Sequence, residues 1–302
     1  MSDTFWRQLQ EITGEARCFR QEPMGRHTTF RVGGPAEYYA CPKRSQIAPL
    51  IALCQSQGMP WMVIGNGSNL LVGDKGIKGV VIELGKDASE VKVEGNSLTA
   101  EAGALLSAAA RNAAEHGLAG MEFASGIPGT VGGAVAMNAG AYGGEMKHIV
   151  NKVTVLTMEG REEELSLQDM DFGYRHSCVF ENHSIVLEAE FALEQGNIED
   201  IRGRMAELRS RRSEKQPLEY PSAGSTFKRP EGYFAGKLIQ DAGLRGYRVG
   251  DAQVSEKHCG FVINRGGATA AEIRRLISDV QEKVEAQSGV SLEPEVRFLG
   301  EF

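Results

Sequence analysis

The glycine-rich segment from residue 122 to residue 144 constrains this chain more than any other stretch. It reads EFASGIPGTVGGAVAMNAGAYGG, and no helical or strand period runs through it. Glycine loses more backbone entropy on folding than any other residue, so contacts from outside the segment must order it. Glycines also leave backbone N–H groups uncovered, and such amides form concavities that bind anions. The segment therefore predicts either a turn packed between strands or a loop that holds a diphosphate.

A second glycine cluster lies between residues 65 and 69, in the sequence VIGNGSNLLV. It directly follows an apolar run at residues 61–64 that is typical of a strand. One isolated cluster would favour the packed turn. Two clusters on one chain favour a long dinucleotide that lies between them.

Composition and charge narrow the class of protein. The 302 residues are 41% hydrophobic and 24% charged, which is typical of a globular enzyme of one large or two to three small domains. We expect no membrane span, since no apolar run reaches about eighteen residues. The N-terminal sequence lacks the pattern of a signal peptide, so we expect a cytoplasmic protein. A net charge of −7 argues against a nucleic-acid partner and means that a phosphate-bearing ligand needs local positive charge.

Metal and disulfide chemistry is not expected. The five cysteines are scattered and never spaced as CxxC, so neither a disulfide framework nor a zinc site is indicated. No HExxH or metal-spaced histidine pair occurs. No G-x-G-x-x-G precedes a helix, and no G-x-S-x-G occurs. Residues 232–237 resemble a P-loop that is one residue short, so we interpret Lys237 as an ordinary surface or packing residue.

Hydrophobic periodicity and capping signals predict the secondary structure. Ser45 is expected to cap a helix that ends before Gly58, and Asn197 another that runs to about residue 212. Thr269 and Glu272 form a capping box for a last helix that ends at Gly289. A further helix is expected at residues 104–116. Residues 27–39 are expected to form a strand that enters a turn at residues 33–35. The other expected strands are residues 61–64, 80–84, 91–95, 97–103, 152–158 and 184–193, with a strand-like tail from residue 293.

Five stretches in order resemble one known family. GNGSNLLV, SGIPGTVGGAVAMNAGAYG, YRHS, AGSTFKRP and LEPEVRFLG are similar to the UDP-N-acetylenolpyruvoylglucosamine reductases of peptidoglycan synthesis. The resemblance runs from about residue 23 to the end. The segment between residues 175 and 225 is short for this family. This is similar to the second type in the family, which lacks an inserted loop with a substrate-binding tyrosine.

The resemblance implies an α+β fold. Residues 1–203 are expected to form a two-part FAD-binding domain of the vanillyl-alcohol-oxidase (PCMH) type, with parts at about 1–84 and 85–203. Residues 204–302 are expected to form a smaller α+β substrate-binding domain. FAD is implied to bind noncovalently, to be reduced by NADPH, and to be re-oxidised by UDP-N-acetylglucosamine enolpyruvate, which yields UDP-N-acetylmuramate. The expected cofactor contacts are Gly65, Asn66, Gly67, Ser68, Asn69, Ser125, Gly126, Ile127, Pro128, Gly129, Gly132, Gly133, Ala134, Asn138, Ala139 and Gly140.

Arg175, Ser225 and Glu295 match the family's catalytic positions. Arginine can clamp the carboxylate of an enolpyruvyl ether through a bidentate pair. A protonated glutamic acid can donate a hydrogen bond to that group as charge develops on it. Serine can supply a proton to the neighbouring carbon as general acid. Taken singly, each residue also has an ordinary interpretation: Arg175 paired with an acid such as Asp171, Ser225 in a turn, and Glu295 as a solvated charge.

A basic cluster ends the helix that begins near residue 197. Lysine and arginine are favoured at a helix C-terminus by its dipole, which explains about half of this cluster. The helix dipole does not account for the other basic side chains, which could bind the substrate's diphosphate. Lys215 is the first candidate. The expected substrate contacts are Lys215, Arg211, Lys228 and Arg297.

Two alternatives stay open at the level of sequence. One is an FAD-dependent sugar or lactone oxidase of the same fold that uses oxygen as acceptor. The other is a non-catalytic regulator that binds a nucleotide sugar. In either case the expected partner is a small molecule.

Overall fold

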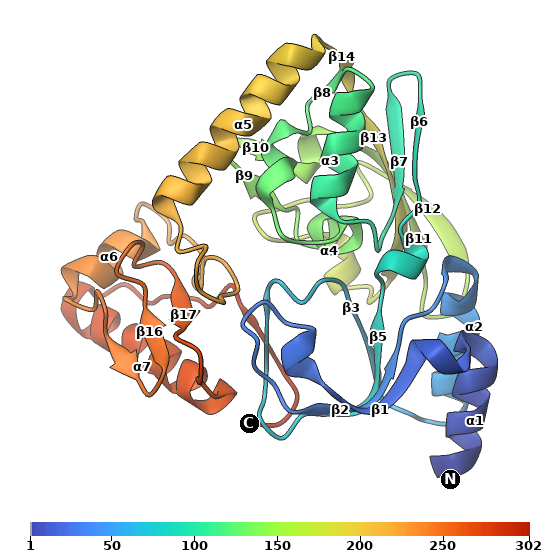
Figure 1. Cartoon of the computed structure of the whole chain (residues 1–302), viewed down its shortest axis with the longest axis horizontal. Coiled ribbons are helices and arrows are strands. Elements are labelled where there is room, and N and C mark those ends of the chain that lie inside the picture. The colour runs from blue at the N-terminus through green and yellow to red at the C-terminus, as the bar shows by residue number, and fades with distance from the viewer. Residues whose placement is uncertain (1) are drawn as a thin grey trace. The chain divides into compact units, whose positions relative to one another are not determined.

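The computed structural model describes residues 2–302, with side chains from residue 3 onward (Figure 1). The chain forms two compact units, each with its own hydrophobic core, and the two interleave along the sequence. Unit 1 comprises the N-terminal residues up to 20 together with residues 38–66 and 79–211. Unit 2 comprises residues 21–37, 67–78 and 212–302.

The largest sheet of unit 1 has five antiparallel strands in the order β12-β11-β13-β7-β6 (Figure 1). Buried and half-buried residues alternate along β7, because successive side chains of a strand point to opposite faces. The edge strand β12 carries Glu162, Glu163 and Glu164, and charges on an edge oppose pairing with another chain. The strands are β6 (Val91–Glu94), β7 (Ser97–Glu101), β11 (Val150–Leu156), β12 (Glu162–Ser166) and β13 (Ile185–Ala192).

A second sheet has four strands in the order β1-β2-β5-β3. Its β3 and β5 run parallel, with Trp61 opposite Val80. The first glycine cluster begins where β3 ends, as the sequence predicts. The strands are β1 (Cys18–Pro23), β2 (Pro35–Ala40), β3 (Trp61–Ile64) and β5 (Ile77–Glu83).

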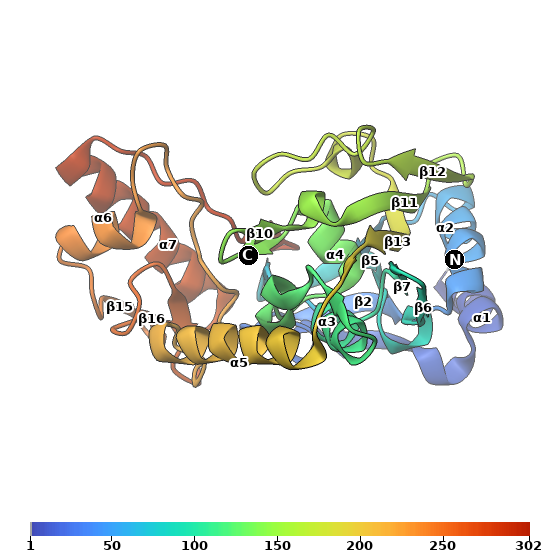
Figure 2. The same ribbon diagram turned by 90° about the horizontal axis from the view of Figure 1, so that it is seen from above.

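Helices α3 and α4 contact the five-stranded sheet at β7, and α4 also contacts β13 (Figure 2). Alanines on the buried face of α3 keep that helix close to its neighbours. Asn197 caps α5 as expected, since its Oδ1 accepts hydrogen bonds from the backbone N–H groups of Glu199 and Asp200. The helices that begin in unit 1 are α1 (Ser2–Thr13), α2 (Ile47–Ser56), α3 (Leu106–Glu115), α4 (Val131–Ala136) and α5 (Ile198–Lys215).

The core of unit 2 is built on α7, whose apolar face contacts β15, β16, β17 and α6. Its predicted capping box is confirmed, with Thr269 Oγ1 accepting from the Glu272 N–H and Gly289 ending the helix at φ +69°. The predicted apolar face at Ile273, Leu276, Ile277, Val280 and Val284 is also confirmed as buried. The elements are β4 (Leu70–Val72), α6 (Ala235–Asp241), β15 (Arg248–Val249), β16 (Ala252–Val254), β17 (Val262–Asn264), α7 (Ala270–Ser288) and β18 (Arg297–Leu299).

Short elements complete the chain. The two-residue strands pair as β8 (Leu118–Ala119) with β14 (Glu194–Gln195) and β9 (Gly140–Ala141) with β10 (Gly144–Glu145). Strands β4 and β18 pair in parallel. The 3-10 turns are Glu15–Arg17, Met24–Arg26, Arg44–Gln46, Lys86–Ala88, Glu122–Gly126, Met146–His148 and Cys178–Phe180.

Some expectations about local structure were wrong. Within residues 27–39 only the part from Pro35 onward is a strand, because the preceding residues form turns. Helix α2 begins at Ile47 with Gln46 as its N-cap, since residues 44–46 form a 3-10 turn that includes Ser45. The glycine-rich segment contains the short helix α4, although glycine disfavours helix.

Candidate active site

The two glycine clusters meet in unit 1. The Asn66 side-chain amide donates a hydrogen bond to the Pro128 carbonyl oxygen at 3.1 Å. A Cβ on Gly65 would lie 2.2 Å from Oγ1 of Thr130, so only glycine fits at this contact. Thr130 is also the N-cap residue of α4. The structure thus brings residues 65–66 of the first cluster against residues 128–130 of the second.

Neighbouring glycines in α4 have different surroundings. A Cβ on Gly132 would lie 2.8 Å from the Ala102 Cβ, and the Gly132 N–H donates to the Ala102 carbonyl at 2.8 Å. That N–H is therefore not uncovered, contrary to the expectation from the sequence. A Cβ on Gly133 would meet only Thr130 Oγ1 within 4 Å, at 3.6 Å. Gly133 is exposed and leaves open space beside the helix.

The second half of the first cluster belongs to unit 2. Gly67 has φ +58°, and a Cβ there would lie 1.9 Å from the His27 carbonyl oxygen, so its own backbone requires glycine. The Asn69 side chain donates to the Glu295 carbonyl oxygen at 2.9 Å. The Asn69 carbonyl accepts from the Arg297 N–H at 3.0 Å. Asn69, expected as a cofactor contact, is therefore hydrogen-bonded to the backbone of both Glu295 and Arg297.

Arg175 lies in a tight turn of unit 1. Gly173 and His176 form an isolated β-bridge across it, and Arg175 adopts φ +58°. The Arg175 guanidinium lies 5.1 Å from the centroid of the exposed Tyr174 ring. Asp171, weighed above as its ion-pair partner, lies 3.9 Å from Nε2 of His176.

The glycine-rich segment holds this turn in place. Asn138, which is 1% exposed, donates to both the Gly173 carbonyl oxygen and Glu145 Oε2 at 2.9 Å. Its own Oδ1 accepts from the Lys147 N–H at 3.0 Å. Burial alone would raise the pKa of Glu145, but hydrogen bonds from Lys147 and Asn138 outweigh it and hold that pKa below its ordinary value. Asn138 thus connects the second glycine cluster to the Arg175 turn.

Ser225 and Glu295 lie together in unit 2. The Glu295 N–H donates to the carbonyl oxygen of Thr226 at 2.8 Å, directly beside Ser225. Phe227 and Pro294 form a β-bridge one step further along the same pair of segments. The Ser225 side chain is exposed and Glu295 is half-buried.

The expected substrate contacts differ in the partners that they already have. Arg211 Nη2 lies 2.7 Å from Glu207 Oε1 on the same helix, and Lys228 pairs with Glu293. Burial lowers the pKa of Arg297. Within the part of the chain that the structure describes, Lys215 has no ion-pair partner, and its side chain is exposed. Lys215 is therefore the residue of this set best suited to receive an anionic ligand.

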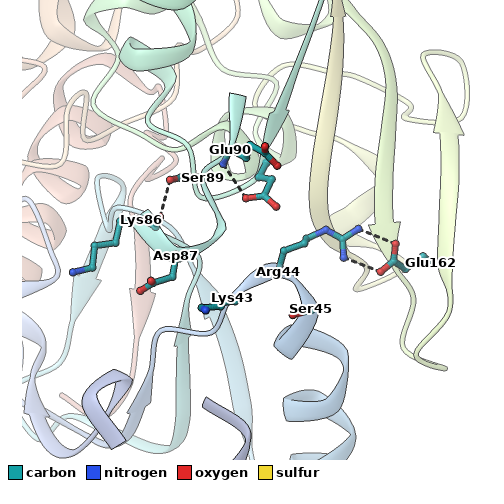
Figure 3. Close-up of a pocket in the computed structure, with 9 residues that line it drawn as sticks. Lys43, Arg44, Ser45, Lys86, Asp87, Ser89, Glu90 and Glu162 are labelled. Atoms are coloured by element: carbon teal, nitrogen blue, oxygen red, sulfur yellow. Dashed lines mark hydrogen bonds and ion pairs between the residues drawn. The ribbon is translucent and has the colours of Figure 1, made fainter. Parts of the chain in front are cut away.

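A pocket on unit 1 contains none of the predicted site residues (Figure 3). The Arg44 guanidinium donates two hydrogen bonds, of 2.7 and 2.8 Å, to the Glu162 carboxylate. The acidic side chains that line the pocket outnumber the basic ones by four to three, so the pocket offers no net positive charge to a diphosphate. We assign it no ligand. Its lining residues are Lys43, Arg44, Ser45, Lys86, Asp87, Ser89, Glu90, Glu101 and Glu162.

Thr226 lies within the AGSTFKRP stretch, but neither it nor Asp74 was singled out from the sequence. Their hydrogen-bond partners come from segments far along the chain, so no local pattern indicates them. Among residues 3–302, no cluster of three or more histidine, cysteine, aspartate or glutamate side chains is suited to a metal ion. No helix within the described residues is both long and apolar enough to cross a bilayer.

Comparison with known proteins places these features in one family. A family model described as the C-terminal domain of UDP-N-acetylenolpyruvoylglucosamine reductase matches residues 216–299. A second model, described as an FAD binding domain, matches residues 35–166. The UDP-N-acetylenolpyruvoylglucosamine reductase of Agathobacter rectalis is 57% identical over 314 residues, covering 100% of both chains. The chain belongs to the UDP-N-acetylenolpyruvoylglucosamine reductase family.

Further relatives agree with this membership. The reductase of Caldanaerobacter subterraneus subsp. tengcongensis is 52% identical over 302 residues, again covering 100% of both chains. The crystal structure of the reductase from Thermus caldophilus is 36% identical, covers 92% of this chain and 97% of its own, and has a TM-score of 0.80. An alkyldihydroxyacetonephosphate synthase structure is 13% identical, covers 64% of this chain and 41% of its own, and has a TM-score of 0.50. That last likeness concerns the fold alone. The reductase family thus combines an α+β FAD-binding fold of the vanillyl-alcohol-oxidase type with its own C-terminal domain, as the sequence predicts.

Proposed function

We propose that this chain is an FAD-containing, NADPH-dependent oxidoreductase that reduces UDP-N-acetylglucosamine enolpyruvate to UDP-N-acetylmuramate for peptidoglycan synthesis. The observation that carries the proposal is full-length identity of 57% to a reductase of that name. We also propose the cytoplasm as its location, because NADPH and nucleotide sugars are cytoplasmic metabolites. The domain boundary that we propose remains at residues 203 and 204, with two parts of the first domain meeting near residue 84.

The glycine clusters fit a bound dinucleotide. Open space beside Gly133 would be filled by any larger side chain, and the contact of Asn66 with Pro128 brings the two clusters together. We propose that residues 65–69 and 125–140 hold FAD, chiefly at its diphosphate through backbone amides other than that of Gly132, which donates to Ala102. Bound FAD would supply the redox chemistry by accepting hydride from NADPH and passing it to the enolpyruvyl methylene carbon.

The residues of the chain would then bind and protonate the substrate. Arg175 pairs with the enolpyruvyl carboxylate and offsets the charge that develops there. Glu295, carrying a proton, donates a hydrogen bond to the same group, as an oxyanion-hole donor does. The Ser225 hydroxyl delivers a proton to the carbon beside the carboxylate. The paired backbone of Thr226 and Glu295 supports a shared role for residues 225 and 295. Arg175 lies in unit 1, and its assignment to the same reaction rests on the sequence resemblance.

The substrate's diphosphate is assigned to Lys215. Its exposed ammonium group without an ion-pair partner among the described residues supports this role. Arg211, Lys228 and Arg297 are proposed as further contacts to the nucleotide sugar.

The experiment that tests the function is NADPH consumption by the purified protein. We expect consumption to require the enolpyruvyl nucleotide sugar and to continue without oxygen. Consumption that requires oxygen and ignores the sugar would instead identify the oxidase alternative. Binding of the sugar without any NADPH consumption would identify the regulator.

A further inference from the structure

Thr226 connects the two proposed catalytic residues of unit 2, because it directly follows Ser225 and its carbonyl oxygen accepts a hydrogen bond from the Glu295 N–H. Its side chain is fully buried, at 0% exposure. Its Oγ1 accepts a hydrogen bond from the Val262 N–H at 2.9 Å, and its N–H donates to the Gly260 carbonyl at 2.8 Å. Thr226 is therefore fixed to the segment at residues 260–262 by both its backbone and its side chain.

Glu295 is held at both of its backbone polar groups. Its N–H donates to the Thr226 carbonyl at 2.8 Å. Its carbonyl accepts from the Asn69 side chain at 2.9 Å. The Asn69 carbonyl in turn accepts from the Arg297 N–H at 3.0 Å. The segment that carries Glu295 therefore lies between Thr226 on one side and Asn69 on the other.

We propose that Thr226 and Asn69 are positioning residues that fix Glu295 relative to Ser225, and this inference rests on the proposed function. Ser225 is exposed and immediately precedes Thr226, so the anchored threonine sets where the serine hydroxyl can lie. Asn69, the last residue of the first glycine cluster, holds the Glu295 backbone from the other side. Neither side chain needs to contact the substrate. A displacement of about 1 Å at a reacting group can cost about 10²-fold in rate, which makes such positioning measurable.

Substitutions at Thr226 isolate its hydroxyl. Thr226→Val has nearly the same shape but leaves the buried Val262 N–H without an acceptor. Thr226→Ser keeps the acceptor. The matched control is Thr269→Val, because Thr269 Oγ1 also accepts a backbone N–H in unit 2 but at the start of α7. Asn69→Ala removes the second contact, and it keeps the proposal testable if Thr226→Val does not fold.

The measurement separates the two half-reactions of the FAD-loaded protein. We expect Thr226→Val to slow oxidation of the reduced flavin by the enolpyruvyl nucleotide sugar about 10- to 10²-fold. Flavin reduction by NADPH should change by less than about twofold, and Thr226→Ser should restore oxidation. Asn69→Ala, measured after it has been loaded with FAD, should slow the same step.

Several results would overturn the inference. Equal slowing of both half-reactions, or a Thr226→Val variant that matches Thr269→Val, would show that Thr226 only supports the fold. An FAD-loaded Asn69→Ala variant that is oxidised as fast as the unsubstituted protein would show that Asn69 does not position Glu295. Failure of the proposed function itself would look different, because the unsubstituted protein would then not be oxidised by the nucleotide sugar at all.

Discussion

At the scale of single residues, two neighbouring glycines of α4 have different roles. Gly132 packs against Ala102, whereas Gly133 faces the open space that we assign to FAD. We expect Gly133→Leu to fold but to be purified without its yellow colour, since the side chain fills the open space beside α4. Gly132→Leu should instead destabilise the fold, because its Cβ would lie 2.8 Å from that of Ala102. FAD absorbance and thermal unfolding measure the two effects. Gly203→Leu is the control, since a Cβ there meets nothing within 4 Å. A fully yellow Gly133→Leu variant would remove Gly133 from the cofactor site.

Glu145 predicts a pH dependence of stability. Its folded pKa is held below the ordinary value, so ionised Glu145 stabilises the fold above its unfolded pKa of about 4.3. That stabilisation is lost as the pH falls through the folded pKa, because both states then bind the proton. Glu145→Gln should therefore lower the melting temperature at neutral pH and lower it less in acid. We expect an effect below about 1 kcal/mol, since the carboxylate is partly exposed. A melting-temperature difference that stays constant with pH would contradict the role of the charge.

At the scale of elements, the start of α7 depends on a residue far away in sequence. The two carboxylate oxygens of Asp74 accept from the N–H groups of Ala270 and Ala271, each at 2.8 Å. Asp74→Ala should lower the free energy of unfolding of unit 2 by about 1–2 kcal/mol, measured by urea denaturation. Asp74→Asn keeps one acceptor oxygen and should lose less. Equal stability of Asp74→Ala and the unsubstituted protein would show that the Thr269 capping box suffices.

The C-terminal end of α5 predicts a second effect at this scale. Lys215→Ala should weaken binding of the nucleotide sugar about tenfold or more while leaving FAD bound, because a charge-assisted contact to the diphosphate is lost. Titration of the purified protein with the nucleotide sugar measures this. Arg202→Ala, on the same helix, is the control. Unchanged affinity of Lys215→Ala would mean that the basic cluster serves the helix dipole.

The elements that were predicted correctly are those with local signals. The caps of α5 and α7 and the apolar face of α7 can be identified within a few residues of sequence. Strand β12 was missed because an edge strand of EEELS has no apolar alternation. Helix α4 was missed because its glycines argue against helix, while its N-cap Thr130 and the contact with Ala102 favour it.

At the scale of the whole molecule, the interleaving of the two units could not be predicted from composition. Residues 21–37 and 67–78 form part of unit 2, although they lie within the range 1–203 along the sequence. The hydrogen bond of the Asn69 side chain to the Glu295 carbonyl is one of the contacts within unit 2 that join residues far apart in sequence. The motifs nevertheless identified the family, because they recur in order along nearly the whole chain. The strand-like tail was predicted, but its pairing with residues 226–228 was not, since that segment carries no strand period.

The most direct test of the proposed function is a single turnover of pre-reduced enzyme without oxygen. Mixing with UDP-N-acetylglucosamine enolpyruvate should return the yellow flavin absorbance and yield one UDP-N-acetylmuramate for each flavin. Glu295→Gln keeps a hydrogen-bond donor and should react faster than Glu295→Ala, which should lose about 10²–10³-fold. A flavin that stays reduced with the nucleotide sugar but is re-oxidised by oxygen would contradict the reductase and favour the oxidase.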